Sequence, residues 1–153
     1  MHRSKVVSPM HFVWATRERL PLITSEIAAD LYRCLESEAS RAGCEVLAIG
    51  GMPDHVHLAV MFPATISYSK FMQQLKGTTS KLMKNLLPPE TYFYWQEGYG
   101  AFGFSPKEIN AVIAYINHQE RHHNRNQLWP TLEQTYEDVL PTSEGRLAKP
   151  PSE

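Results

Sequence analysis

The chain has 153 residues, of which 42% are hydrophobic, so it is long enough for one domain with a substantial core and has an ordinary globular composition. Its formal net charge of −1 excludes a uniformly basic nucleic-acid coat protein, although a local basic surface is compatible with that total. The sequence has no apolar run of the roughly 18 residues that a membrane span needs and no secretory signal pattern, so we expect a cytoplasmic protein without a membrane anchor.

The first half of the chain predicts a strand, a helix and a hairpin. Residues 10–16 are rich in aromatic and β-branched types, which favour a strand. Residues 25–42 have apolar positions at helical spacing and are followed by a glycine suited to a helix exit. Residues 45–50 and 55–62 are typical of strands, and the turn residues at 51–54 predict that they pair as a hairpin.

The second half predicts two more helices. The first covers residues 67–87 and stops before two prolines. Residues 91–104 are aromatic and punctuated by glycine, which indicates one or two short strands or a loop. A capping box at 105–108 begins the last helix, which has an apolar stripe. We expect one domain over residues 1–140 and a disordered tail over 141–153.

The order of these elements is strand, helix, strand, strand, helix, strand, helix. It predicts an α+β fold of the split βαβ type, with an antiparallel sheet and the first two helices packed on one face. One face of the sheet is then left uncovered by these two helices.

Two histidines in the second strand of the hairpin are the first candidate site residues. His55 and His57 are two residues apart, so both side chains leave the same face of the sheet, opposite the apolar set Val56, Leu58, Val60 and Phe62. This spacing lets both imidazoles reach one metal ion. The alternative is a pair of half-exposed histidines with no ligand.

A tyrosine and a glutamine on the last helix are the second candidate pair. At about 100° per residue, Tyr115, Gln119 and His122 fall within about 60° of one another, on a polar face roughly 100° from the centre of the apolar stripe. Tyr115 and Gln119 can therefore address a common site. The alternative is a core-edge tyrosine beside a solvated glutamine.

Charge is distributed unevenly along the chain. Residues 65–87 contain four lysines and no acid, whereas the segment after residue 131 is rich in Glu and Asp. The lysine helix indicates a surface that binds nucleic acid, or an ordinary solvated helix face.

Four motifs in order resemble the HUH single-tyrosine transposases of bacterial insertion sequences and their relatives associated with repetitive extragenic palindromes. The motifs are MPDHVHLAV around His55 and His57, KFMQQLKGTTS over 70–80, WQEGYGAF over 95–102 and YINHQ over 115–119. The resemblance covers about residues 8–125. Each motif falls on the element where that family has it, so the combination is far more specific than any one motif.

The resemblance implies a ferredoxin-like fold, a homodimer and a site residue set. Tyr115 is then the nucleophile, and His55, His57 and Gln119 are the metal ligands. We expect Mg²⁺ or Mn²⁺ as the cofactor, because imidazole and amide donors leave coordination positions open for phosphate and water. The roles of His118, His122 and His123 stay open.

The expected activity is nicking and rejoining of single-stranded DNA, with hairpins or element ends as the sites recognised. Tyr115 forms a 5'-phosphotyrosine, and the reverse step rejoins the strand. The candidate DNA contacts are Lys70, Lys76, Lys84 and Trp95, since bases of single strands stack on aromatic rings beside cations. Two alternatives are a nonenzymatic binding module and a metal-dependent phosphodiesterase that uses water. In a dimer, the glycine-containing segment before the last helix suggests that Tyr115 and Gln119 complete the partner's histidine pair.

Overall fold

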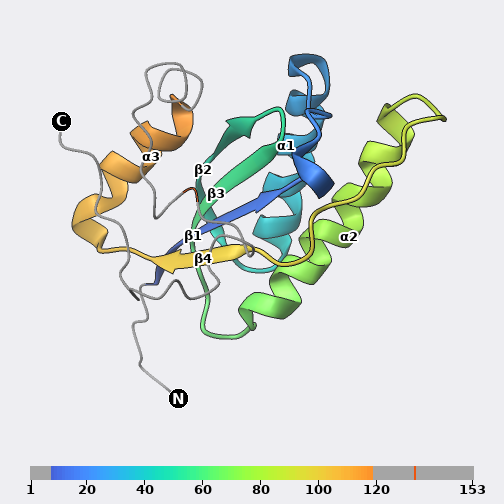
Figure 1. The fold of residues 1–153 in the computed structure, drawn as a ribbon. Helices are drawn as coiled ribbons and strands as arrows, with labels where there is room; N and C mark the ends of the chain where they lie inside the picture. Colours follow the sequence, from blue (N-terminus) through green and yellow to red (C-terminus); the bar gives the residue numbers. More distant parts are fainter. Residues whose placement is uncertain (1–7, 119–132, 134–153) are drawn as a thin grey trace, which may run out of the picture.

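Four antiparallel strands form a single sheet in a computed structural model, which describes residues 8–118 and Glu133 (Figure 1). The strands are β1 (Pro9–Ala15), β2 (Glu45–Met52), β3 (His55–Met61) and β4 (Gly100–Gly103), in the order β2-β3-β1-β4. Strand β3 therefore lies between β1 and β2, which is the ferredoxin-like split βαβ arrangement. The expected α+β class and its antiparallel sheet are confirmed. The expected tail over 141–153 lies outside the described residues.

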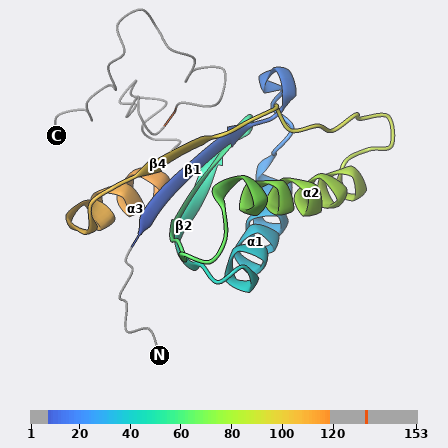
Figure 2. The same ribbon diagram turned by 90° about the horizontal axis from the view of Figure 1, so that it is seen from below.

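Helices α1 (Ser25–Arg41) and α2 (Tyr68–Leu86) cover one face of the sheet (Figure 2). Because side chains alternate along a strand, Phe12 and Trp14 of β1 point to this face together with Val56, Leu58 and Val60 of β3. All five side chains are fully buried and belong to the main hydrophobic core. This is the core that the apolar residues of the hairpin predicted.

The opposite face carries α3 (Ile109–Asn117), which follows a short 3-10 helix, η2 (Pro106–Glu108), with the expected capping box. Figure 2 shows α3 across the sheet from α1 and α2. Small residues face α3 here, because Ala48 and Ala59 form a second buried cluster with Val112, Tyr115 and Ile116. The helix can therefore lie close to the strands.

One glycine makes this close approach possible. A Cβ atom placed on Gly50 of β2 would lie 2.5 Å from the carbonyl oxygen of Ile116 and 3.0 Å from its Cγ2 atom. Any side chain at residue 50 would therefore push the backbone of α3 away from the sheet. The position of Tyr115 depends on this contact, since Tyr115 precedes Ile116 on α3.

The loop between α2 and β4 is tied to α2 and to the end of β1. The ammonium of Lys76 donates hydrogen bonds to the carbonyl oxygens of Gln96 and Gly98, and the indole of Trp95 donates to Thr79 Oγ1 at 3.0 Å. Of the strands or loop expected over 91–104, only β4 and an isolated bridge between Thr16 and Trp95 are present in the described chain.

Candidate active site

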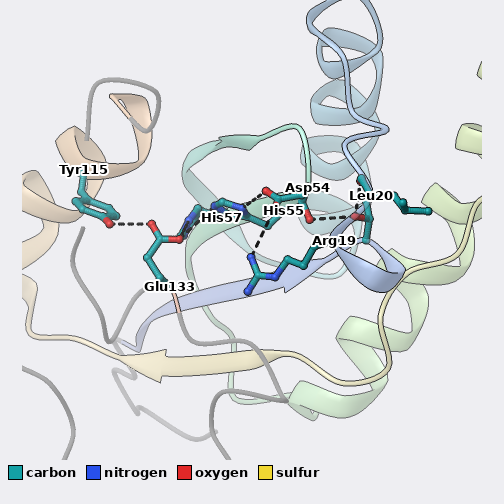
Figure 3. A network of polar contacts seen from close by, with 8 residues as sticks. Arg19, Leu20, Asp54, His55, His57, Tyr115 and Glu133 are labelled. Carbon is teal, nitrogen blue, oxygen red and sulfur yellow. Dashed lines mark hydrogen bonds and ion pairs between the residues drawn. The ribbon is translucent and has the colours of Figure 1, made fainter. Parts of the chain in front are cut away.

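The two histidines of β3 are buried side chains on the α3 face of the sheet. His55 is 2% exposed and His57 is 0% exposed, so the alternative of half-exposed histidines is wrong. Nδ1 of His55 donates a 2.7 Å hydrogen bond to the carboxylate of Asp54, which fixes the ring and turns Nε2 toward α3 (Figure 3). Outer-shell carboxylates hold metal-binding imidazoles in this way.

A third histidine, which the sequence analysis did not single out, orients His57. His11 of β1 is completely buried, and its Nε2 atom lies 2.8 Å from Nδ1 of His57. If Nε2 of His57 binds a ligand, its proton is on Nδ1, and Nδ1 then donates to His11. Strand alternation could have found His11, because it leaves β1 opposite Phe12 and Trp14 and hence on the face of the histidine pair.

Glu133 reaches the site from a segment distant in sequence. Its Oε2 atom lies 3.1 Å from His57 Nε2 and 3.2 Å from His55 Nε2. Its Oε1 atom accepts a 2.7 Å hydrogen bond from the Tyr115 hydroxyl. One carboxylate therefore joins the nucleophile candidate to both histidines, as Figure 3 shows. No spacing or motif in the sequence marks this glutamate among the acids that follow residue 131.

Tyr115 lies beside the histidine pair of its own chain. Its ring is T-shaped against that of His57, with centroids 6.2 Å apart, and the residue is 4% exposed. The expectation that Tyr115 occupies a polar face separate from the apolar stripe is wrong. Both Tyr115 and Ile116 pack on the sheet, because small residues below α3 let a wide arc of the helix be buried.

Electrostatics in the site favour an ion pair between imidazole and carboxylate. Burial alone lowers the pKa of His55, but its hydrogen bonds to Asp54 and Glu133 outweigh burial and raise the pKa to about 9. Burial also opposes ionisation of Glu133, yet both histidines hold the pKa of that carboxyl far below its ordinary value. A cation that binds here therefore displaces a proton from His55.

The donor set fits a divalent metal ion. The ligand atoms of His55, His57 and Glu133 lie within 4.8 Å of one another. Neighbouring ligands on an octahedral ion with bonds of about 2.1 Å lie about 3 Å apart, which is close to the 3.1 and 3.2 Å between carboxylate and imidazoles. Two imidazoles and one carboxylate suit transition ions such as Mn²⁺ and leave coordination positions open.

The other expected site residues do not contact the histidine pair among the described residues. Gln119, the expected third ligand, lies outside the described residues, as do His122 and His123. Lys70 and Lys84 are exposed on α2, as DNA contacts require. Lys76 instead donates to carbonyl oxygens of the loop before β4. Trp95, in that loop, donates to Thr79 of α2, and its ring packs on Trp14 and Phe93.

Three comparisons place this chain among known proteins. Residues 5–119 match the family described as "Transposase IS200 like". The ISDra2 transposase TnpA of Deinococcus radiodurans is 32% identical over 73 residues, which are 48% of this chain and 52% of that protein. The chain thus spans about half the length of the curated relative it matches.

Solved structures with the same fold include a crystal structure described as a transposase from Deinococcus radiodurans R1. It has 25% identity and a TM-score of 0.64, over 78% of this chain and 95% of the other. A REP-associated tyrosine transposase bound to a REP hairpin has 17% identity and a TM-score of 0.58, over 80% of this chain and 73% of the other. At 17% identity, the similarity to this second structure concerns the fold alone.

Proposed function

The chain belongs to the IS200-like transposase family, and from that premise we propose that it nicks and rejoins single-stranded DNA through a covalent bond to Tyr115. The observation that carries this proposal is the contact chain from the Tyr115 hydroxyl through Glu133 to His55 and His57. A tyrosine hydroxyl that donates to a carboxylate at 2.7 Å is held in a fixed orientation, and a site for a cation lies directly beside it.

The proposed step is a transesterification. The phenolic oxygen of Tyr115 attacks the scissile phosphorus and forms a new P–O bond, while the bond from phosphorus to the 3' oxygen breaks. The phenol, which Oε1 of Glu133 orients, gives up its proton to solvent water, and the departing 3' oxygen takes up a proton from water. The product is a 5'-phosphotyrosine with a free 3'-OH, and reversal of the step rejoins the strand. Because one phosphodiester bond replaces another, no nucleotide cofactor is needed.

We propose Mg²⁺ or Mn²⁺ as the ion held by His55, His57 and Oε2 of Glu133, a set in which Glu133 replaces or joins Gln119. Such an ion would supply charge neutralisation at the phosphate, with His55, His57 and Glu133 holding it in place. The two imidazoles favour Mn²⁺ over Mg²⁺. Glu133 would hold the ion and orient Tyr115 at the same time, because separate oxygens face Tyr115 and the histidines.

The proposed substrate is single-stranded DNA next to a hairpin. Support comes from the exposed lysines Lys70 and Lys84 on α2 and from the relative of the same fold that is bound to a REP hairpin. Lys76 and Trp95 would act indirectly, by holding the loop before β4. No helix among residues 8–118 is long and apolar enough to cross a membrane.

Trapping of the covalent intermediate tests the proposed function. Incubation with single-stranded DNA and Mn²⁺ should give an SDS-resistant adduct on the 5' side of the break, which mass spectrometry maps to Tyr115. Tyr115→Phe keeps the buried ring and should abolish the adduct, whereas Tyr92→Phe, a change at an exposed ring, should form it normally. DNA cleavage by the wild type without any adduct would identify a phosphodiesterase in which water attacks, and binding without cleavage would identify a binding module.

We also propose that the protein is a homodimer whose sites are each built within one chain. The support for a site within one chain is the 6.2 Å separation of the Tyr115 and His57 rings, which makes the shared site suggested by the sequence unnecessary, whereas the homodimer itself is proposed from the family resemblance. In mixed dimers of Tyr115→Phe with His57→Ala, sites within one chain leave no complete site, so the mixture should stay inactive after subunit exchange is demonstrated. Recovered activity would show that the sites are shared.

A further inference from the structure

A pocket at the end of β1 combines an exposed aromatic ring with several cations. Its volume is about 670 Å³, within the range of small-molecule sites, and its lining includes Arg17, Arg19, Tyr94 and Trp95. The guanidinium of Arg17 lies 5.5 Å from the centroid of the Tyr94 ring, and the ammonium of Lys84 lies 5.0 Å from it. Three separate segments, η1 (Arg17–Arg19), α2 and the loop before β4, therefore converge on one tyrosine.

The pocket opens at the same end of the sheet as the histidine pair. Ala15, the last residue of β1, is the cross-strand partner of His55, and Arg17 follows only two residues later. The backbone holds Tyr94 there, because Arg17 N–H donates to the carbonyl oxygen of Tyr94 at 2.9 Å. The guanidinium of Arg19 lies 3.8 Å from Asp54, the carboxylate that orients His55 (Figure 3). A strand bound at the active site can thus extend into the pocket.

Packing does not account for the aromatic residues at this place. Tyr94 is 46% exposed and Tyr92 is 81% exposed, so neither ring contributes a filled core position. The backbone beside them is strained, because Glu18 and Arg19 adopt φ angles of 59° and 56°, which non-glycine residues rarely take. Strain of this kind is concentrated at functional sites.

The charges favour a nucleotide over a bare anion. Three cations face Tyr94 or line the pocket, namely Arg17, Arg19 and Lys84, but the carboxylates of Glu18 and Glu97 line it too. Such a mixed set would hold an isolated phosphate poorly. A nucleotide offers a flat base for the ring as well as a phosphate for the cations, and bases of every type present a π face.

We propose that Tyr94 is a stacking platform for one nucleobase of single-stranded DNA beside the cleavage site, with Arg17 and Lys84 on the adjoining phosphates. This inference rests on the proposed function and names a contact that the function does not specify. A base that stacks on the Tyr94 ring takes the place of Arg17 and Lys84 there. Both side chains are then available to the phosphates of the DNA. The platform accepts any base, because stacking carries no hydrogen-bond readout.

The test compares two fluorescent probes of about 16 nucleotides: oligothymidylate, and an abasic strand with the same phosphates. The wild type should bind oligothymidylate more tightly than the abasic strand. Tyr94→Leu should weaken binding of oligothymidylate about tenfold and leave binding of the abasic strand unchanged, because only the stacking partner is lost. Tyr94→Phe keeps the ring and should bind like the wild type.

Control variants distinguish stacking on Tyr94 from a general loss of DNA affinity. Tyr68 is 42% exposed but lies at the other end of α2, so Tyr68→Leu should not change the preference for bases. Lys84→Gln should weaken binding of both probes, whereas Lys81→Gln, at an exposed position on the same helix, should have a smaller effect.

Equal affinity of the wild type and Tyr94→Leu for oligothymidylate would overturn the platform, and an adduct on Tyr115 would show that the proposed function survives. Adduct formation by Tyr94→Leu at saturating DNA would show that the chemistry is intact and that Tyr94 acts in binding. Failure of the wild type to bind either probe would overturn both proposals.

Discussion

The two faces of the sheet are built from the same strands but have opposite compositions. Toward α1 and α2, the strands present large apolar side chains such as Phe12, Trp14 and Leu58, all fully buried. Toward α3, they present imidazoles, alanines and Gly50. The first face supplies the hydrophobic free energy of folding, and the second places polar groups where a helix can approach closely.

Because side chains alternate along each strand, the residues that stabilise the fold and those of the candidate site lie on opposite faces. Even-numbered residues of β3, such as Leu58, face the main core. Odd-numbered residues, such as His57, face the candidate site. The separation is incomplete, because α3 must rest on the site face to bring Tyr115 to the histidines. Substitutions should therefore affect the stability of the main core, the chemistry of the candidate site, or both.

The largest effect on stability is expected at the main core. Leu58→Ala should lower the free energy of unfolding by about 2–5 kcal/mol, because it removes buried methyl groups and leaves a cavity. Adduct formation by the folded fraction should persist, since Leu58 faces away from His57. Urea denaturation followed by circular dichroism measures the first effect, and the trapping assay measures the second. A folded Leu58→Ala protein that forms no adduct would show that the faces are coupled.

The next effect should couple the faces through Gly50. Gly50→Ala places a methyl group against the backbone of Ile116, so it should cost about 1–3 kcal/mol of stability and displace Tyr115 enough to abolish the adduct. Mn²⁺ binding should change less, since the histidines stay on β3. Gly77→Ala is the matched control, because a Cβ there meets nothing within 4 Å on α2 and should stabilise the helix. Wild-type adduct yield in Gly50→Ala would remove the close-approach argument.

A third effect is confined to the site face. His11→Met fills a similar volume but cannot accept the proton of His57 Nδ1, so it should weaken Mn²⁺ binding about 10–100-fold, as loss of an outer-shell partner does. His11→Gln keeps an acceptor near Nε2 and should restore most of that affinity. Titration calorimetry with Mn²⁺ distinguishes the two variants. Equal affinities in both would mean that His11 only fills space.

The smallest effect concerns pH and the loop before β4. Burial lowers the pKa of Lys76 to about 8 from an ordinary value of 10.5, despite the opposing effect of Glu97. Between these values the unfolded chain binds more protons than the folded one, so the free energy of unfolding should rise with pH, by no more than about 1.4 kcal/mol per unit. Below pH 8 this contribution should be flat.

Lys76→Met should abolish that rise, and Lys81→Met, at an exposed position of the same helix, should retain it. The quantity to compare is the difference in unfolding free energy between each variant and the wild type at pH 8 and at pH 10.5. Parallel curves for the wild type and Lys76→Met would show that the buried ammonium loses no proton in this range.

Sequence patterns alone predicted the three helices, the hairpin, the two faces of β3 and the candidate site residues His55, His57 and Tyr115. Alternation in β3 assigns His55 and His57 to one face and Leu58 to the other, because successive side chains leave a strand in opposite directions. The capping box and the motif order fix α3 and Tyr115. Alternation, capping boxes and short motifs involve residues that are close in sequence. They can therefore be recognised without knowing which distant segments are in contact.

The remaining residues of the candidate site are brought in by tertiary packing. Glu133 is 76 residues from His57 in sequence, and His11 is 46 residues away, so no local spacing connects them. The burial of Tyr115 depends on Gly50 and on small residues in other strands, and the hydrogen bonds of Lys76 and Trp95 join α2 to the loop before β4. Long-range contacts of this kind are created by packing, which a periodic pattern does not record.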